Sequence, residues 1–393
     1  MVKIRSCLAI ILGVLSICLA SCKSGNSAAE SSKAITIDID EKDVSEFKLS
    51  ELFSDFELLK LKSGDTPIGR INKFKIFNNK IYILSESKIF VYAESSELLS
   101  IIDKKGKGPG EYIGVSDFTT DKEGNIYIAD ISGKQILKYK VSGDFIDAWN
   151  TGFYFSGIDI YRDKYFLFTG NSNMNGEAGE NMILGFNNWK DKVPEYKFLS
   201  IDRNIANYMN FLDVYNLREA QGRLLLGTSG FDTIYTITDQ AIEPYYILNY
   251  LNGKIPRSAL DKEFADVREF SEYFMKKGYS HYAFYYLDSP EFFFSRYNHA
   301  MKSYINVFDK KNNSSFNWDG IMDDIFLPNT KHEIYEFYPL AYHDSWYYFI
   351  YQPYKIINYL EKNGFGKIDL SKVSKEFLES INEDDNPIIL KIK

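Results

Sequence analysis

The sequence predicts an all-β fold in which one unit of short strands repeats. A polar turn followed by an aromatic or β-branched strand occurs six times along the 393 residues. The separations between successive units are 45, 39, 59, 68 and 54 residues, which is close to or longer than the roughly 40 to 50 residues of a four-stranded repeat. The equivalent positions are Tyr82, Tyr127, Phe166, Leu225, Phe293 and Tyr347. Short polar connections between the strands favour antiparallel sheets over helical crossovers.

The clearest unit begins with the glycine-rich stretch KGKGPGEY at residues 105–112. Glycine tolerates positive φ, and proline fixes φ and donates no hydrogen bond, so this stretch predicts a tight connection between two strands. Its spacing matches neither of the glycine patterns that cradle phosphates, so we interpret it as structural. The predicted structural loop comprises Gly106, Gly108, Pro109, Gly110, Glu111 and Tyr112.

Two helical segments interrupt the strands. Residues 256–278 carry Pro256 near the start, Gly278 at the end and apolar residues at helical spacing, which predicts one amphipathic helix. Residues 370–381 have a similar pattern and precede a final strand at residues 388–392. The fold is therefore predominantly, but not entirely, composed of strands.

The two ends of the chain offer a way to join the repeats into a ring. Residues 35–39 alternate isoleucine with polar residues, and residues 388–392 are a second strand. Pairing both within one sheet would close the ring and remove open strand edges. The alternative is that each strand lies at the outer edge of a different sheet.

The sequence KGKGPGEY, together with Asp117 and Phe118, GNIYIAD at residues 124–130 and ILKY at residues 136–139, resembles NHL-like six-bladed β-propellers. It is especially similar to the lipoprotein propellers of Bacteroidetes. The resemblance implies a single six-bladed β-propeller over residues 35–393. The helical insertion would then lie between blades four and five, and a short C-terminal helix would precede the closing strand. Activity in that family is largely unassigned, so the resemblance implies architecture and location rather than chemistry.

The N-terminus resembles a bacterial lipoprotein signal. Lys3 and Arg5 precede an apolar run at residues 8–19, and Leu-Ala-Ser-Cys follows at residues 19–22. We expect removal of residues 1–21, acylation of Cys22 by fatty acids such as palmitate, and a flexible tether over residues 22–34. A transmembrane anchor is disfavoured because the run is shorter than about 20 residues. Since Lys23 is not an acidic retention residue, we expect the outer membrane, on either its periplasmic or its surface face.

Composition excludes several classes of partner and site. The three cysteines are Cys7, Cys18 and Cys22, so the folded part has no thiol for a disulfide, a zinc site or a nucleophile. The net charge is −8 and becomes −10 without residues 1–21, with 44 basic and 54 acidic residues remaining. An acidic chain without a basic stripe is not expected to bind nucleic acid.

No motif in the chain predicts a metal, a cofactor or a catalytic triad. The four histidines show no HExxH pattern, and no GxSxG elbow is present. In a propeller the first strand of each blade lines a central channel, where polar residues either bind a ligand or bond one another and water. The candidate binding residues are Arg70, Asn72, Asp117, Asp159, Asn210, Asp213, Arg296 and Glu336.

Aromatic residues are abundant, with 30 Tyr, 30 Phe and 4 Trp. Most must fill the core between sheets. Clusters at residues 152–155, 282–286 and 346–348 exceed what strand alternation would bury, so we expect some of their tyrosines at a surface. Exposed tyrosines suit stacking on a sugar or anchoring a protein.

These observations predict a lipid-anchored envelope propeller that binds a glycan or a partner protein. The lack of catalytic motifs favours a binding module over an enzyme. An alternative is a glycan lyase or hydrolase at the channel mouth, using carboxylates with tyrosine or histidine. A structural scaffold is a third possibility that sequence cannot separate from the first.

Overall fold

A computed structural model describes residues 34–393 apart from residues 63, 65, 171–178, 203–215, 229–231 and 239–240. Residues 34–393 form one compact unit. The predicted signal peptide, Cys22 and most of the tether lie outside the described residues, as do Asn210 and Asp213.

The described strands form six sheets, numbered here in chain order with the N-terminal strands β1, β2 and β3 left aside, so that the first strands are β4, β8, β12, β16, β20 and β25. Sheet 1 contains β4 Ile71–Phe77, β5 Lys80–Ser85, β6 Lys88–Ala93 and β7 Leu98–Ile102. Sheet 2 contains β8 Asp117–Thr120, β9 Ile126–Asp130, β10 Gln135–Tyr139 and β11 Phe145–Asn150. Sheet 3 contains β12 Gly157–Tyr161, β13 Lys164–Phe168, β14 Asn181–Phe186 and β15 Tyr196–Ser200. These three sheets are simple antiparallel meanders, as the short polar connections predict.

The other three sheets recruit strands from the N-terminal segment. Sheet 4 contains β16 Leu217–Ala220, β17 Arg223–Gly227, β18 Thr233–Ile237, β19 Ile242–Tyr250 and β1 Ile35–Ile39. Sheet 5 contains β20 His281–Asp288, β21 Phe292–His299, β22 Lys302–Asp309, β23 Ser314–Asp323, β24 Thr330–His332 and β2 Val44–Lys48. Sheet 6 contains β25 Ala341–His343, β26 Trp346–Tyr351, β27 Ile388–Ile392 and β3 Phe56–Lys60. The first strand of every sheet lies at one end of its strand order.

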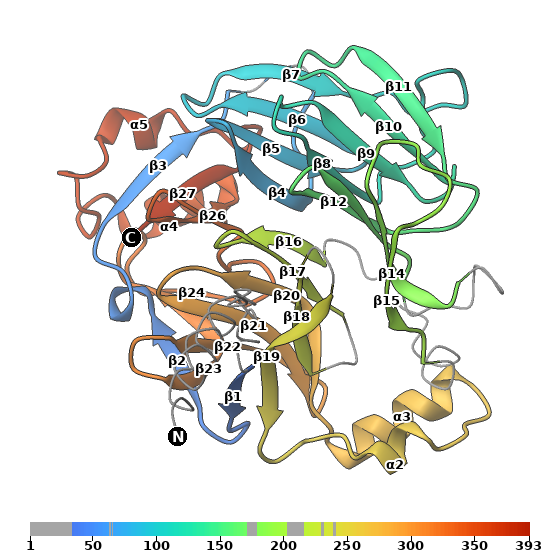
Figure 1. Cartoon of the computed structure of the whole chain (residues 1–393). Coiled ribbons are helices and arrows are strands. Elements are labelled where there is room, and N and C mark those ends of the chain that lie inside the picture. The colour runs from blue at the N-terminus through green and yellow to red at the C-terminus, as the bar shows by residue number, and fades with distance from the viewer. Residues whose placement is uncertain are drawn as a thin grey trace, which may run out of the picture. The chain divides into compact units, whose positions relative to one another are not determined.

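These first strands face one another around a common centre (Figure 1). Contacts join β8 to β12, β12 to β16, β20 to β25 and β25 to β4. The ring continues from β4 to β8 through Lys73, whose Nζ lies 2.6 Å from Asp117. Between sheets 4 and 5, the Tyr286 hydroxyl lies within hydrogen-bond distance of the carbonyl oxygens of Asn216 and Leu225, at 3.0 Å and 2.9 Å. This radial arrangement is a β-propeller, which confirms the predicted all-β class.

The prediction of which two strands close the ring is correct for the C-terminal strand and wrong for the N-terminal strand. Residues 388–392 pair with Phe56–Lys60, so the N-terminal partner in sheet 6 is β3 rather than residues 35–39. Ile35–Ile39 instead pairs in parallel with β19 at the outer edge of sheet 4, and Val44–Lys48 does the same beside β23. Ile37 and Ile39 are buried there, which explains their alternation without a closing role. A parallel edge strand has the same alternating pattern as a closing strand.

The predicted helices are located correctly but differ in extent. Between β19 and β20, the single helix expected over residues 256–278 is two helices, α2 Arg257–Leu260 and α3 Val267–Lys277. The Asp266 side chain accepts from the Glu269 N–H and caps α3, so a new helix begins where one was expected to continue. After β26 lie α4 Pro353–Asn363, which the sequence did not suggest, and α5 Lys375–Glu379, shorter than the expected 370–381. A 3-10 turn, η1, spans Leu49–Glu51.

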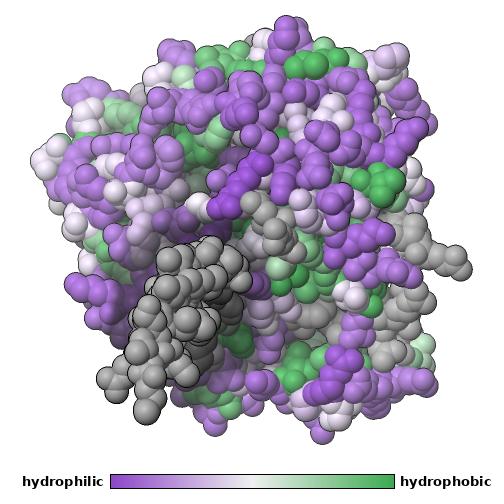
Figure 2. Space-filling model, viewed as in Figure 1, coloured by the Kyte–Doolittle hydropathy of each residue, from purple (hydrophilic) through white to green (hydrophobic). Residues whose placement is uncertain are grey.

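The core consists of apolar clusters between neighbouring sheets. One cluster joins sheets 1 and 2, and others join sheets 2 and 3, 3 and 4, 4 and 5, 5 and 6, and 6 and 1. Most strands in the middle of a sheet are therefore covered on both faces; every residue of β9 is buried. The six equivalent aromatic or branched positions all lie on the second strand of their sheets, as the repeats predict. Figure 2 shows mainly hydrophilic side chains on the visible face of the molecule.

Covering both faces also corrects the expectation for two aromatic clusters. Tyr282 and Tyr286 are 1% exposed, and Tyr347 and Tyr348 are 2% exposed. Alternation exposes half of a strand only when one face of its sheet meets water, and that condition fails between two sheets. The tyrosines that reach the surface lie elsewhere.

The glycine-rich stretch connects sheets 1 and 2. The Gly106 N–H donates to the Tyr112 carbonyl at 2.9 Å, and the Gly108 N–H donates to the Glu111 carboxylate at 2.7 Å. Tyr112 is fully buried, and its hydroxyl donates to the Ser87 carbonyl at 2.8 Å. Gly110 has φ +74°, and an added Cβ there would lie 2.7 Å from the Phe145 ring. The polar groups of this loop are largely engaged within the fold, which fits a structural connection.

In the described part of the chain, no helix has the length and apolar character needed to cross a membrane.

Candidate functional site

Two cavities lie along the first strands of the sheets. We call the larger, of about 790 Å³, the arginine cavity, and the smaller, of about 480 Å³, the carboxylate cavity. The cationic residues of the arginine cavity are Arg70, Arg218, Arg296 and Lys355, and its tyrosines are Tyr285, Tyr335, Tyr338, Tyr351 and Tyr354. The acidic residues of the carboxylate cavity are Asp159, Glu219 and Asp288. Arg218 contributes to both cavities.

Two tyrosine rings orient the guanidinium of Arg296. Its central carbon lies 4.5 Å from the ring centre of Tyr338 and 5.5 Å from that of Tyr285. The Tyr285 hydroxyl is itself fixed, because it donates to the Pro339 carbonyl at 2.6 Å. One guanidinium nitrogen of Arg296 donates to the Ile334 carbonyl at 3.0 Å, whereas the buried Nε has no hydrogen-bond partner. Cation–π contacts and this single hydrogen bond therefore position the cation without neutralising it.

Cationic side chains outnumber acidic ones among the described residues that line the arginine cavity. Glu336 is the one acid among them, and its carboxylate pairs with the Lys355 ammonium. Among the described residues, no carboxylate forms an ion pair with Arg70 or Arg296. Arg70 is exposed at the end of the cavity where β4 begins. The cavity thus presents two arginines without acidic partners.

His332 lies in the wall of the same cavity as a neutral side chain. It is 1% exposed, and its Nε2 lies 3.1 Å from the Tyr351 hydroxyl. Burial, together with the nearby charge of Lys355, lowers the pKa of His332 to about 3. The Tyr351 hydroxyl donates to the buried Asp323 carboxylate, so the imidazole is left to donate to the Tyr351 oxygen. His332 supports the wall and does not add to the charge of the cavity.

Exposed aromatic surface borders the arginine cavity. Tyr335, in the turn before β25, is 61% exposed, and Tyr354, in the first turn of α4, is 47% exposed. They are the two tyrosines among the exposed large apolar residues of the described chain. A ring with a polar tip beside a wet cavity can stack on a planar or sugar ligand at low entropic cost.

The charges near the carboxylate cavity are paired within the protein. The Lys73 ammonium donates to Asp117 at 2.6 Å and to the Phe118 carbonyl at 2.8 Å. The Lys75 ammonium donates to the Thr119 hydroxyl at 2.8 Å and lies 3.7 Å from Asp159. These contacts join sheets 1, 2 and 3 at their first strands, and they leave little uncompensated positive charge on that wall.

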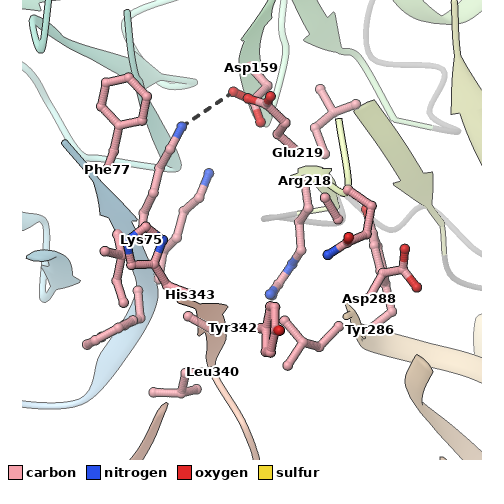
Figure 3. A pocket seen from close by; sticks show the side chains of 18 of the residues that line it. Lys75, Phe77, Asp159, Arg218, Glu219, Tyr286, Asp288, Leu340, Tyr342 and His343 are labelled. Carbon is pink, nitrogen blue, oxygen red and sulfur yellow. Dashed lines mark ion pairs between the residues drawn. The ribbon is translucent and has the colours of Figure 1, made fainter. Parts of the chain in front are cut away.

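Glu219 is the acid of the carboxylate cavity that has no ion pair among the described residues. Figure 3 shows Asp159 and Glu219 on the wall that Lys75 faces. Burial raises the pKa of Glu219, the charge of Asp159 raises it further, and Lys75 opposes both effects. The side chain of Glu219 is open to the cavity, and the surrounding protein shifts its pKa above the ordinary value of a glutamate.

No metal site is evident in the described ranges, where no group of three or more metal-ligating side chains occurs. The acids of the carboxylate cavity are instead engaged by lysine and hydroxyl groups, or, in the case of Glu219, stand apart. Asp288 accepts from the Tyr246 hydroxyl at 2.9 Å and from the Lys310 ammonium at 2.6 Å.

A family model of a domain of unknown function, DUF4934, matches residues 34–393. The chain belongs to the DUF4934 family. The match spans the whole described unit, so the propeller and this family domain coincide.

Two solved structures illustrate how far the fold is shared. A protein named as exported, from Bacteroides fragilis NCTC 9343, superposes with a TM-score of 0.71 at 17% identity, covering 92% of this chain and 99% of that one. A member of the DUF4221 family from Bacteroides vulgatus ATCC 8482 has a TM-score of 0.48 at 12% identity, covering 87% and 97%. At this identity the first similarity establishes the fold alone. No curated protein matches the chain.

Four of the eight predicted binding residues meet at the arginine cavity: Arg70, Asn72, Arg296 and Glu336. Their positions differ partly from the prediction. Asn72 lies on a first strand, whereas Arg70 precedes β4, Arg296 lies on the second strand of sheet 5, and Glu336 lies in the turn before β25. The cavity therefore gathers residues from strands and loops of sheets 1, 5 and 6.

The remaining candidates do not join that group. Asp159 lines the carboxylate cavity. Asp117 is fully buried and lines neither cavity, because it accepts hydrogen bonds from Lys73 and from the backbone of Phe118 and Ile158. Function near Asp117 was the expectation, and the structure gives this residue a structural role between sheets.

Several important residues were absent from the sequence-based set. Tyr335 and Tyr338 lie in the segment EIYEFY at residues 333–338, whose alternation suggests a strand although the structure forms a turn. Glu219 shares the first strand of sheet 4 with Arg218, and that strand follows residues outside the described ranges. The sequence signal that could have identified Tyr335 and Tyr338 is the high density of tyrosine and acidic residues in the stretch 333–338.

Proposed function

We propose that this protein is a lipid-anchored, six-bladed propeller of the cell envelope that binds a glycan at the arginine cavity. The six described sheets support the blade number. A cavity of about 790 Å³ lies within the roughly 300 to 1,000 Å³ range of small-ligand sites. The observation that carries the proposal is the pair of exposed rings, Tyr335 and Tyr354, beside polar side chains of one cavity.

A glycan is favoured over a protein partner because the aromatic surface borders a concave site. Protein partners usually bury broad patches of at least several hundred Å². A sugar ring needs one or two aromatic faces and a few directed hydrogen bonds, which Asn72, Arg70 and the tyrosine hydroxyls supply. A partner protein remains the competing outcome of the test.

The test is a glycan array probed with the full-length protein extracted in mild detergent. Binding to a defined set of glycans is expected, and the double variant Tyr335→Ala/Tyr354→Ala should lose it. Met301→Ala is a suitable control, because Met301 is 81% exposed in the turn between β21 and β22. Equal binding by both variants, or no glycan binding by the natural protein, would contradict the proposal.

Lipid anchoring rests on the N-terminal sequence. We expect cells fed an alkyne analogue of palmitate to label the protein, and Cys22→Ala to abolish labelling and move the protein into the aqueous phase of a detergent partition. Labelling that survives in Cys22→Ala would contradict acylation at this residue. Fractionation of the natural protein with outer-membrane markers tests the expected membrane.

Glycoside hydrolysis in the carboxylate cavity is a second candidate function. The specific observation is that Asp159 is surrounded by donors while the pKa of the neighbouring Glu219 is raised. Two carboxyl groups in different environments can serve as acid and base. Glu219 would give its proton to the glycosidic oxygen as that bond breaks, while Asp159 takes a proton from the water that adds to the anomeric carbon.

This second candidate predicts release of reducing sugar from an oligosaccharide by the natural protein. Glu219→Gln should abolish the release, and Glu263→Gln, at an exposed position beyond α2, should not. Absence of release from every oligosaccharide that binds would favour the binding module.

A further inference from the structure

We infer that the ligand of the arginine cavity is an anionic sugar, recognised through its carboxylate or sulfate group by Arg296 and Arg70. The inference rests on the proposed glycan-binding function and narrows it to one chemical class. Its basis is the charge of the cavity, which is independent of the exposed tyrosines.

Elsewhere in the protein, partly buried lysines are neutralised by nearby carboxylates. Lys73 pairs with Asp117, Lys310 pairs with Asp288, and Lys75 lies near Asp159. Removing a cation from water is costly, so a buried cation normally has an acidic partner. Arg296 departs from this pattern, because it is half-buried and, among the described residues, its hydrogen bond is to the neutral carbonyl of Ile334.

The geometry of Arg296 supports the inference as well. The rings of Tyr338 and Tyr285 hold its guanidinium by cation–π contacts, and the Nη2–H is held by the Ile334 carbonyl. A guanidinium held in this way has lost much of its side-chain freedom before a ligand arrives. Planar guanidinium groups match carboxylate and sulfate oxygens better than ammonium groups do.

The charge of the arginine cavity is opposite in sign to the net charge of the chain. The chain carries a net charge of −8, yet among the described residues that line the arginine cavity Arg296 and Arg70 have no acidic partner, and the one acid, Glu336, is paired with Lys355. A positive cavity in an acidic protein attracts anions selectively, since the remaining surface repels them. Arg70, exposed at the cavity rim, extends this attraction to solvent.

The experiment is calorimetric titration of the full-length protein in detergent with three oligosaccharides. Trigalacturonate carries carboxylates, a κ-carrageenan oligosaccharide carries sulfates, and cellotriose is neutral. We expect one or both anionic probes to bind at least about tenfold more tightly than cellotriose, and this preference to shrink in 0.5 M salt. The two anionic probes distinguish a carboxylate ligand from a sulfate ligand.

Two variants and a control locate the effect. Arg70→Gln alters an exposed residue and should weaken the anionic probe severalfold without affecting folding. Arg296→Gln should weaken it at least about tenfold, since a charge-assisted contact is replaced by a neutral one. Arg268→Gln is the matched control, because Arg268 is 86% exposed on α3.

The outcomes separate this inference from the proposed function. Equal binding of cellotriose and both anions, lost in Tyr335→Ala/Tyr354→Ala but unchanged in Arg296→Gln and Arg70→Gln, overturns the anionic ligand and keeps glycan binding. Absence of binding to all three probes and to the array overturns both.

Discussion

The arginine cavity and the Lys73–Asp117 region both gather charged residues from first strands, but they balance those charges differently. Around Lys73, an ammonium, a carboxylate and two backbone N–H groups satisfy one another within about 3 Å. In the arginine cavity, Arg296 and Arg70 have no carboxylate partner among the described residues, and tyrosine rings hold Arg296 instead. The first arrangement joins sheets, whereas the second leaves charge available to a ligand.

The comparison shows why polarity alone does not identify a site in this fold. Asp117 and the glycine-rich loop have the most conspicuous sequence patterns, and their polar groups bond mainly within the protein. Arg296 and Arg70 belong to no motif, and they have no carboxylate partner among the described residues. We therefore expect charge without an internal partner to indicate a ligand site better than sequence motifs do in this fold.

Breaking the Lys73–Asp117 pair should have the largest effect on stability. Lys73→Ala leaves the fully buried Asp117 carboxyl without its cationic partner, which should lower the free energy of unfolding by about 3 to 5 kcal/mol. Urea denaturation followed by tryptophan fluorescence measures the change. Lys372→Ala, which breaks the exposed pair with Asp55, should cost less than about 1 kcal/mol, and equal costs would contradict the contrast.

Gly110→Val extends the comparison to the glycine-rich loop. Valine would be strained at φ +74° and would clash with Phe145, so we expect a loss on the order of 2 to 3 kcal/mol. Gly222→Val is the control, because Gly222 has φ +70° but nothing within 4 Å of an added Cβ. The melting temperature should fall more for Gly110→Val; an unaltered melting temperature would disprove the structural role of this loop.

His332 should make the wall of the arginine cavity sensitive to acid. Its pKa is about 3 in the folded protein, below the ordinary 6.5, so the unfolded state takes up a proton first as the pH falls. Stability from this residue is present above about pH 6.5 and declines toward pH 3, by about 2 kcal/mol at pH 5. His332→Gln keeps a donor for Tyr351 and should remove this part of the pH dependence. The same acid loss in both proteins would contradict the assignment.

Glu336→Gln should have the smallest effect on stability and should sharpen the charge argument. The pair with Lys355 is partly exposed, so the free energy of unfolding should change by less than about 1 kcal/mol. Removing this acid, the one among the described lining residues, should instead strengthen binding of an anionic probe about two- to fivefold. Weaker binding in Glu336→Gln would show that Glu336 contacts the ligand directly.

Sequence reasoning recovered the periodic part of the fold. Tyr82, Tyr127 and the other equivalent positions lie on second strands because each repeat buries that strand between two sheets. The closing strand was misassigned because residues 35–39 and 56–60 both have apolar residues suited to a strand. The two segments differ only in which strand they pair with, and the partner of residues 56–60 lies more than 300 residues away in the chain. A local sequence pattern contains no information on such a distant partner.

The grouping of the candidate residues was predicted in part. Arg70, Asn72, Arg296 and Glu336 line one cavity, as expected of polar residues near first strands, and their role in binding stays a prediction. That these residues lie apart from Asp117 depends on how sheets 1, 5 and 6 pack together. The exposure of Tyr335 depends on a turn, and a turn has no regular sequence pattern from which exposure can be predicted. Whether a charge is paired internally is a property of three-dimensional contacts, so it required the structure.

The most direct measurement is a crystal structure of the protein with the tightest-binding anionic oligosaccharide from the titration. The account predicts a carboxylate or sulfate oxygen within about 3 Å of an Arg296 guanidinium nitrogen, with a sugar ring against Tyr335 or Tyr354. An oligosaccharide bound in the carboxylate cavity, or on the outer strands away from Arg296, would contradict it.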